Sequence, residues 1–320
     1  MAGKLKKYKG KIIALIVIVV GFLSFYFGMQ QHTDKRLCTR IPIRFSSANT
    51  PVVNVVIEGA VFSFEIDLGS KFPLVLNSKL LKPIQKKFEE VVKWRDLKGV
   101  AYEGNLYCIP EISISGFLWK DVRVQEENSS YAENIVLWTD EKQNSNRQDF
   151  GTIGRPLLER TNLCFDMVNR VVFACDRMES LKQLGEFYED FEKFPFELTR
   201  AGVVLEIVTD FGKGKFIIDT GSTLTLVRAS FLNCSEGKKD WRGMTCVSTS
   251  KFIIGNKNFG SMDLYPWDIS SELIEMDGML GMDFLKNQVF YIDYPNKVIY
   301  IRNTDLATFF GQREHVFFKT

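Results

Sequence analysis

The strongest constraint on the fold is an internal repeat, and its first part is a short acidic turn that occurs twice. In each copy an apolar strand precedes Asp-x-Gly-Ser and a Leu-Val pair follows, and the copies begin at Asp67 and Asp219. One such turn is ordinary, because Asp, Gly and Ser are frequent in tight turns. The second copy predicts that the chain is built from two related halves.

A second repeated block lies further along each half. It reads Gly-x-(Ile/Leu)-Gly, then an apolar strand, an Asp, an Asn-basic turn and another strand, and its second glycine is Gly154 or Gly281. Twelve residues separate each of these glycines from the Asp of its block, Asp166 or Asp293. Two ordered pairs of motifs in one chain predict two lobes of similar topology.

Alternating apolar and polar residues predict a β-rich chain with a few short helices. We expect a helix over 78–98, from apolar residues at helical spacing, and a hairpin over 100–109 with its tip at 103–105. The expected segments are a basic cytoplasmic N-terminus (1–11), a transmembrane signal anchor (12–29), a stalk (30–43), an N-terminal lobe (44–176), an interlobe linker (177–194), a C-terminal lobe (195–303) and a C-terminal tail (304–320).

The N-terminus predicts a membrane anchor. Five lysines lie in residues 1–11, and 12–29 is an 18-residue run without charge. As a helix this run is about 27 Å long, close to the thickness of a hydrocarbon core. Lysines before the run keep the N-terminus cytoplasmic and place the lobes in a periplasmic, extracellular or lumenal space. The alternative is a cleaved signal peptide, but no clear small-x-small cleavage site follows the run.

Charge and histidine content narrow the chemistry. Lys and Arg number 41 against 39 Asp and Glu, which gives no bias toward nucleic acid. The two histidines, His32 and His315, lie outside the expected lobes, which disfavours a His-ligated metal and a Ser-His-Asp triad. We therefore expect carboxylate chemistry without a metal or an organic cofactor.

Six cysteines suit an exported protein, and they allow 15 connectivities. They are Cys38, Cys108, Cys164, Cys175, Cys234 and Cys246. Cys164 with Cys175 and Cys234 with Cys246 are the closest pairs along the chain, while buried free thiols remain an equal alternative.

The chain resembles the pepsin-like, bilobal aspartic proteases, which are the duplicated relatives of the retropepsins. The resemblance is carried by the paired Asp-x-Gly turns and by the later apolar-apolar-Gly motifs at 152–154 and 279–281. The resemblance covers roughly 44–303, and it implies an all-β fold of two similar β-barrel-like lobes of the pepsin type, with a few short helices, after the transmembrane helix expected at 12–29. It implies that Asp67 and Asp219 share a proton at the lobe interface, so that one activates a water and the other polarises the scissile carbonyl. The residues that the resemblance assigns to the support of this dyad are Gly69, Ser70, Thr220, Gly221, Ser222, Gly154 and Gly281.

Two further features follow from the resemblance. The family carries a flap hairpin with an aromatic residue near its tip, and Tyr102 is the candidate, although a tyrosine packed in an ordinary hairpin explains it equally well. The family also has Thr or Ser directly after each catalytic Asp. Thr220 fits this pattern, whereas Leu68 has no hydroxyl, so half of the cross-lobe hydrogen bonding is missing.

The sequence thus predicts a membrane-anchored aspartic endopeptidase. Its partners are an extended peptide or protein substrate and the lipid bilayer around 12–29, with no nucleic acid. Because of Leu68, the alternative is a catalytically inactive, protease-like binding or assembly module in the cell envelope or lumen. A plain envelope scaffold explains the repeat and the anchor but not the paired Asp-x-Gly-Ser turns.

Overall fold

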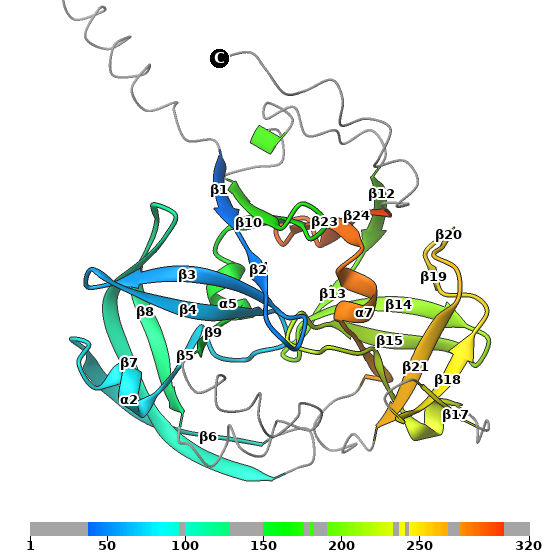
Figure 1. Ribbon diagram of the computed structural model, residues 1–320, viewed down its shortest axis with the longest axis horizontal. Helices are drawn as coiled ribbons and strands as arrows, with labels where there is room; N and C mark the ends of the chain where they lie inside the picture. Colours follow the sequence, from blue (N-terminus) through cyan, green and yellow to red (C-terminus); the bar gives the residue numbers. More distant parts are fainter. Residues whose placement is uncertain are drawn as a thin grey trace, which may run out of the picture. The chain divides into compact units, whose positions relative to one another are not determined.

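The computed structural model describes residues 38–95, 100–127, 150–175, 180–181, 191–232, 237–240, 243–267 and 276–303. Within these ranges the chain forms three β-sheets and a few short helices (Figure 1), as predicted for an all-β fold. The predicted anchor at 12–29, the tail at 304–320 and most of the linker at 177–194 lie outside the described residues. None of the helices in the described part is long and apolar enough to cross a membrane.

The first sheet belongs to the N-terminal half, with strand order β2-β3-β4-β9-β5-β8-β7-β6. A further pairing of β3 with β7, which sets Val56 opposite Ser113, curls the sheet toward a barrel. Its elements are β2 (Arg44–Phe45), β3 (Pro51–Ile57), β4 (Ala60–Asp67), β5 (Leu74–Asn77), α2 (Ser78–Leu81), β6 (Lys87–Arg95), β7 (Ala101–Ile114), β8 (Phe117–Glu127), β9 (Phe150–Gly154) and α5 (Arg155–Leu158).

The second sheet belongs to the C-terminal half, with strand order β17-β18-β21-β16-β22-β15-β14-β19-β20 and β13 paired to β14. Its elements are β13 (Glu197–Leu198), β14 (Val203–Thr209), β15 (Gly212–Ile218), β16 (Leu226–Arg228), η2 (Ala229–Leu232), β17 (Lys238–Lys239), β18 (Thr245–Thr249), β19 (Ile253–Ile254), β20 (Lys257–Asn258), β21 (Met262–Trp267), β22 (Gly278–Leu280) and α7 (Met282–Leu285).

The two sheets repeat one strand crossing, which positions both acidic turns. In the first half β9 runs parallel to β4 and antiparallel to β5, and Asp67 lies opposite Gly154. In the second half β22 runs parallel to β15 and antiparallel to β16, and Ile218 lies opposite Leu280. Each acidic turn therefore leaves its strand beside the second glycine of its own Gly-x-x-Gly motif.

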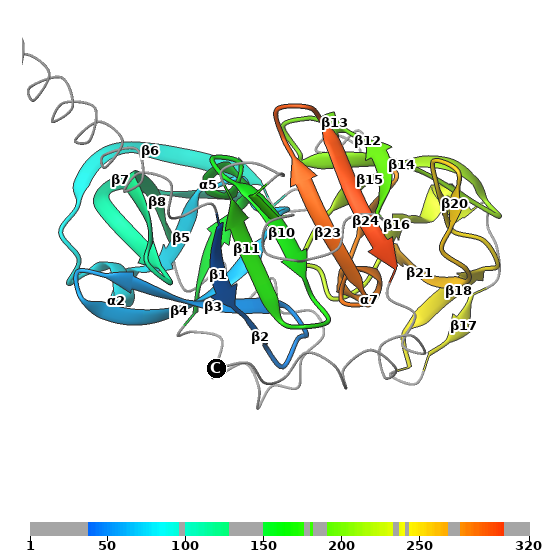
Figure 2. The ribbon, with the colours of Figure 1, turned by 90° about the horizontal axis from the view of Figure 1, so that it is seen from above.

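The third sheet combines strands from both halves, in the order β1-β11-β10-β23-β24-β12 (Figure 2). The halves meet where β10 pairs with β23, and the rings of Phe165 and Phe290 stack there at 4.7 Å. Its strands are β1 (Cys38–Pro42), β10 (Asn162–Asp166), β11 (Val171–Cys175), β12 (Glu192–Pro195), β23 (Gln288–Asp293) and β24 (Val298–Asn303). Part of the predicted stalk, 38–42, and the end of the predicted linker, 192–194, are thus strands of this sheet.

The repeated Asp-Asn-basic turns close both hairpins of the third sheet in the same way. In each turn the Asp accepts hydrogen bonds from the backbone and side-chain N–H groups of the Asn three residues later, and the basic residue adopts a left-handed φ. The residues are Asp166, Asn169 and Arg170 in one turn and Asp293, Asn296 and Lys297 in the other.

A disulfide joins Cys38 on β1 to Cys175 on β11. This pair is not one of the two closest along the chain. Across the β10–β11 hairpin, Cys164 lies opposite Phe173 and Cys175 lies opposite Asn162, so these two cysteines do not face each other. Cys234 lies outside the described residues. The covalent link attaches the first described strand to the sheet that joins the halves.

The predicted helix over 78–98 is wrong, because the structure has only the single turn α2 there, followed by strand β6. Asn77 caps α2 by accepting the backbone N–H of Leu80 at 3.0 Å. Pro83 then removes a backbone donor, which stops the helix. The apolar residues of β6 contact β7 rather than a helical neighbour, as the edge contact of Phe88 with Tyr107 shows.

The predicted hairpin tip at 103–105 is also wrong. These residues pair with 91–93 inside the β6–β7 ladder, in which Arg95 lies opposite Ala101. Strand β7 therefore continues unbroken through the expected tip.

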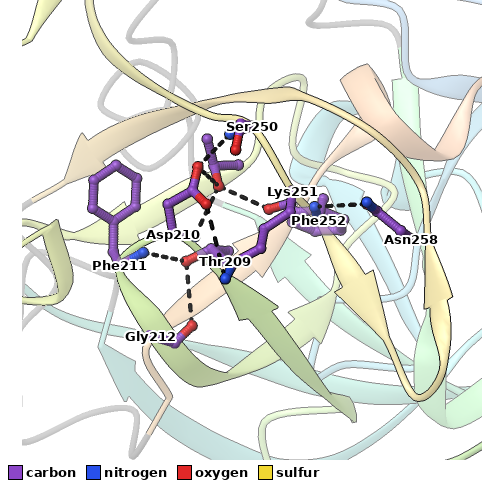
Figure 3. Close-up of polar contacts among 9 residues, drawn as sticks. Thr209, Asp210, Phe211, Gly212, Ser250, Lys251, Phe252 and Asn258 are labelled. Carbon is purple, nitrogen blue, oxygen red and sulfur yellow. Dashed lines mark hydrogen bonds and ion pairs between the residues drawn. The ribbon is translucent and has the colours of Figure 1, made fainter.

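The β14–β15 turn is fastened at the far end of the strand that carries Asp219 (Figure 3). Asp210 accepts hydrogen bonds from the hydroxyl of Thr249 and the backbone N–H of Ser250. Because β15 has seven residues, this turn lies about 20 Å from the acidic turn. Asp210 is thus a hydrogen-bonded carboxylate well away from the candidate site.

Candidate active site

The structure brings Asp67 and Asp219 together, and their carboxyl groups hydrogen-bond to each other. Each carboxyl is also held by its own turn. Oδ1 of Asp67 accepts the backbone N–H groups of Gly69 at 2.8 Å and Ser70 at 3.0 Å. Oδ1 of Asp219 accepts those of Gly221 at 2.8 Å and Ser222 at 3.2 Å. Both side chains are therefore fixed by backbone donors that the Asp-x-Gly-Ser turn supplies.

The glycines of the two turns permit this close approach. A Cβ on Gly69 would lie 2.6 Å from Cγ of Asp219, and a Cβ on Gly221 would lie 2.6 Å from Cγ of Asp67. Each turn thus packs its glycine directly against the carboxyl of the other half. Any larger residue would push the two carboxyls apart.

The glycines of the later motifs lie beneath the turns of their own halves. A Cβ on Gly154 would lie 1.9 Å from the carbonyl oxygen of Phe72, and a Cβ on Gly281 would lie 2.3 Å from that of Leu224. Neither site admits a side chain. This packing explains why a Gly-x-x-Gly motif accompanies each acidic turn.

Burial and mutual repulsion set the ionisation of the pair. Asp219 is buried, and Asp67 is half-buried. Desolvation raises the pKa of Asp67 well above its usual value, and the neighbouring Asp219 raises it further. Desolvation also raises the pKa of Asp219, although hydrogen bonds from Asp67 and the turn oppose that shift. The pair therefore keeps a proton to a higher pH than two isolated carboxyls would, with the larger rise in pKa at Asp67.

Thr220 fastens the two turns together across the halves. Its buried hydroxyl donates to the carbonyl oxygen of Ile66 at 2.7 Å and accepts the backbone N–H of Leu68 at 3.0 Å. Leu68 makes no return bond, since its side chain is fully buried in the apolar core. The C-terminal half thus makes the expected cross-lobe hydrogen bonds through Thr220. In the N-terminal half, apolar packing of Leu68 takes the place of such bonds.

Ser70 and Ser222 support the carboxyls through their backbone and the turns through their hydroxyls. Only the backbone N–H groups of Ser70 and Ser222 reach the aspartates. The hydroxyls donate instead to carbonyl oxygens of their own turns, Ser70 to Phe72 at 3.5 Å and Ser222 to Leu224 at 2.7 Å. The serines thus hold the turns in shape and orient the carboxyls through the backbone.

Tyr102 lies on β7 beside the turn of the β6–β7 hairpin, opposite Trp94 on β6. The Tyr102 and Trp94 rings stack at 5.9 Å, and Trp94 makes an edge contact with Phe72 at 5.5 Å. Phe72 follows the Asp67 turn, so an aromatic chain connects the hairpin to the site. Sequence reasoning missed Trp94 because it fell within the predicted helix.

A further carboxyl, that of the half-buried Asp283, supports the C-terminal turn. Asp283 accepts both the backbone N–H and the hydroxyl of Thr225, at 2.9 and 2.7 Å, and burial raises its pKa. The Thr225 hydroxyl in turn accepts the backbone N–H of Gly281 at 3.1 Å. Sequence reasoning also missed Asp283, although its place two residues after the motif glycine is a usable signal. Over the described residues there is no group of three His, Cys, Asp or Glu that could hold a metal.

Comparisons with known proteins identify the fold. No protein-family model matches the sequence, and no curated protein matches it significantly. Among solved structures, basic 7S globulin from soybean has a TM-score of 0.57 and 10% identity, with 85% of this chain and 96% of that chain covered. The aspartic proteinase from Irpex lacteus has a TM-score of 0.54 and 15% identity, with 85% of this chain and 98% of that chain covered.

The chain therefore has the pepsin-like fold of the aspartic proteinases, as its motifs predicted. One of these two neighbours is named as a proteinase and the other as a globulin, so the likeness establishes the fold alone. Activity has to be argued from the paired aspartates.

Proposed function

We propose that this protein is a membrane-anchored aspartic endopeptidase that hydrolyses peptide bonds with Asp67 and Asp219. The observation that carries the proposal is the hydrogen-bonded pair of carboxyls, each gripped by two backbone N–H groups and each touching the glycine of the other turn. A structural turn has no need to bring two acidic groups into contact, because their repulsion destabilises the fold.

The arrangement supports water activation without a covalent intermediate. Asp219 accepts a proton from a water bound between the carboxyls, and protonated Asp67 donates a hydrogen bond to the scissile carbonyl. The resulting tetrahedral oxyanion is stabilised by that proton and by the fixed geometry of both turns. Collapse of the intermediate breaks the C–N bond, and Asp219 returns the proton that it took from the water to the amine leaving group.

The substrate in this proposal is an extended peptide segment. Both turns project from the ends of β-strands, and a strand-rich site offers backbone N–H and C=O groups to an extended chain. The aromatic contacts of Tyr102, Trp94 and Phe72 link the β6–β7 hairpin to the Asp67 turn and support a flap role for this hairpin.

The proposed location is outside the cytoplasm, with the N-terminus cytoplasmic and 12–29 in the bilayer. Two observations support it. The lysine-rich start and the uncharged run have the order of a signal anchor. The Cys38–Cys175 disulfide is typical of an oxidising compartment. Protease protection of the lobes in sealed membranes, lost on detergent addition, is the expected result.

The decisive experiment compares peptide cleavage by the wild type, D219N and D210N. The two variants make the same chemical change, but Asp210 lies at the far end of β15 in an exposed, hydrogen-bonded turn. We expect D219N to abolish cleavage, D210N to retain it, and a statine-type transition-state mimic to inhibit the wild type. Equal cleavage by the wild type and D219N would reject the proposal.

Leu68 favours a second candidate, a pepsin-like binding or assembly module without proteolytic activity. It lacks the hydroxyl that Thr220 supplies at the equivalent position of the other acidic turn, so the bond between the two turns is made from one side. Under this candidate, partner binding by D219N equals that of the wild type and a statine mimic does not displace the partner.

A further inference from the structure

A constant offset relates the two halves around the site. Strand β3 (Pro51–Ile57) and strand β14 (Val203–Thr209) have equal lengths and are 152 residues apart, as are Asp67 and Asp219. The same offset makes Thr220 the counterpart of Leu68 and Thr223 the counterpart of Lys71. It also makes Arg200, in the turn before β14, the counterpart of Ala48, in the turn before β3.

Two hydroxyls cross from the C-terminal half to the N-terminal half. Thr220 bonds to the backbone of the Asp67 turn, and the hydroxyl of Thr223 donates to the carbonyl oxygen of Ala48 at 2.9 Å. Neither counterpart provides a hydroxyl in return, since Leu68 is apolar and buried and Lys71 is exposed. Cross-lobe hydroxyl bonding at the site is thus one-sided.

Arg155 donates a hydrogen bond in the opposite direction, from the N-terminal half to the C-terminal half. Its Nη2 donates to the carbonyl oxygen of Arg200 at 3.0 Å, and this is the carbonyl that corresponds to that of Ala48. Arg155 directly follows Gly154, the register partner of Asp67. Its side chain is only 9% exposed and forms an ion pair with Glu159. Nε of this guanidinium has no hydrogen-bond partner within the described part of the chain, so its burial is costly and calls for an explanation.

The turn that Arg155 holds lies against the Asp67 turn and against strand β15, which leads to Asp219. A Cβ on Gly202 would lie 3.7 Å from the carbonyl oxygen of Leu68 and 3.9 Å from Nε of Arg155. Beyond Gly202 the chain enters β14, where Val204 pairs with Ile217 on the strand that leads to Asp219. The Arg155 guanidinium therefore connects the Asp67 turn to the strand behind Asp219.

The equivalent positions of the C-terminal half cannot form this ion pair. Counting from Gly281 as from Gly154, the counterparts of Arg155 and Glu159 are Met282 and Lys286. The Arg155–Glu159 ion pair thus belongs to the half whose acidic turn has Leu68 and Lys71 where the other turn has Thr220 and Thr223. We propose that Arg155 is a positioning residue that replaces these hydroxyls and holds the two aspartates in register. This role rests on the proposed peptidase function, which it deepens.

The test compares R155M/E159Q with R160M. The first variant places the side chain of the counterpart Met282 at position 155, and Glu159→Gln leaves no carboxylate without its cation. Arg160 provides a matched control, because its Nη2 also donates to a carbonyl oxygen, that of Lys120, but within the N-terminal half. We expect R155M/E159Q to lower kcat about tenfold or more and to change KM little, because it misaligns the reacting groups. R160M should retain both constants.

The rescue variant is Leu68→Thr. It places at position 68 the hydroxyl that Thr220 carries at the equivalent position of the other turn. In the L68T background, R155M/E159Q should lose less of kcat and should shift the acidic limb of the pH–rate profile less. If L68T does not fold, the loss of kcat in R155M/E159Q compared with R160M is sufficient to test the positioning role of Arg155. An unchanged kcat in R155M/E159Q, or an equal loss in R160M, would overturn the proposal.

Failure of the peptidase function is recognised separately. If D219N and the wild type cleave equally, the unfolding midpoints of the same variants still test the cross-lobe role. R155M/E159Q should then lower the midpoint more in the wild-type background than in the L68T background. Equal losses in both backgrounds would overturn the role of Arg155 whatever the fate of the peptidase proposal.

Discussion

Thr220→Val tests how the two halves are held together at the site. Valine has nearly the shape of threonine, so the buried packing is kept and only the hydroxyl is lost. That hydroxyl makes two cross-lobe hydrogen bonds, to the Ile66 carbonyl and the Leu68 N–H. Since Leu68 offers no second hydroxyl, the variant removes all of this bonding at once.

The expected cost follows from the groups left behind. A buried backbone donor or acceptor without its partner costs about 1–3 kcal/mol, so the two groups together predict a loss of about 2–6 kcal/mol. Thr223→Val removes one bond, to the Ala48 carbonyl, from a half-buried site. It should cost only about 0.5–1.5 kcal/mol. Thr220→Ser keeps the hydroxyl and should cost roughly 1 kcal/mol for the lost methyl.

Urea denaturation followed by intrinsic fluorescence measures these differences, and peptide cleavage across pH measures their effect on the dyad. T220V should be the least stable of the three variants and should lose cleavage more than T223V. A T220V protein within about 0.5 kcal/mol of the wild type would refute the reasoning, because no buried backbone group would then depend on the hydroxyl.

Three further predictions concern the pair and its surroundings. Gly221→Ala places a Cβ 2.6 Å from Cγ of Asp67, so we expect a loss of cleavage of about 100-fold or more in a folded protein, and wild-type cleavage would contradict it. The raised pKa of Asp67 means that the folded protein binds more protons than the unfolded chain above about pH 4, so stability falls as pH rises from there. D67N should remove part of this fall and gain stability over the wild type at pH 7 but not at pH 3, whereas parallel pH curves would be inconsistent with a buried pair. Reduction of the Cys38–Cys175 disulfide, which closes a loop of more than 100 residues, should cost about 4–5 kcal/mol, and an unchanged denaturation midpoint in reductant would rule this out.

The parts of the fold that the sequence predicts are those with local causes. An apolar strand that ends at Asp-x-Gly-Ser forms its turn from neighbouring residues, and the spacing from Gly154 to Asp166 reflects one short helix and one strand. Because both features occur twice, the β-rich class and the two related halves follow from pattern, and the resemblance to the pepsin-like proteases adds the approach of Asp67 to Asp219.

The errors arise where distant contacts override local pattern. Residues 87–95 show helical spacing of apolar side chains, but Pro83 stops the helix and pairing with β7 makes the segment a strand. The disulfide partner of Cys175 depends on the path of β1, which spacing along the chain does not reveal. The role of Arg155 depends on the carbonyl of Arg200, which lies 45 residues away in the sequence.

The central claim is that Asp67 and Asp219 form one ionising unit, and carboxyl NMR titration of protein labelled at the aspartate Cγ atoms tests it most directly. Single Asp→Asn variants assign the two resonances. We predict that the pair loses its protons in two separate steps, with one proton retained well above pH 4, and that D219N abolishes the separation. Two carboxyls that titrate independently near pH 4, each unaffected by loss of the other, would contradict the account.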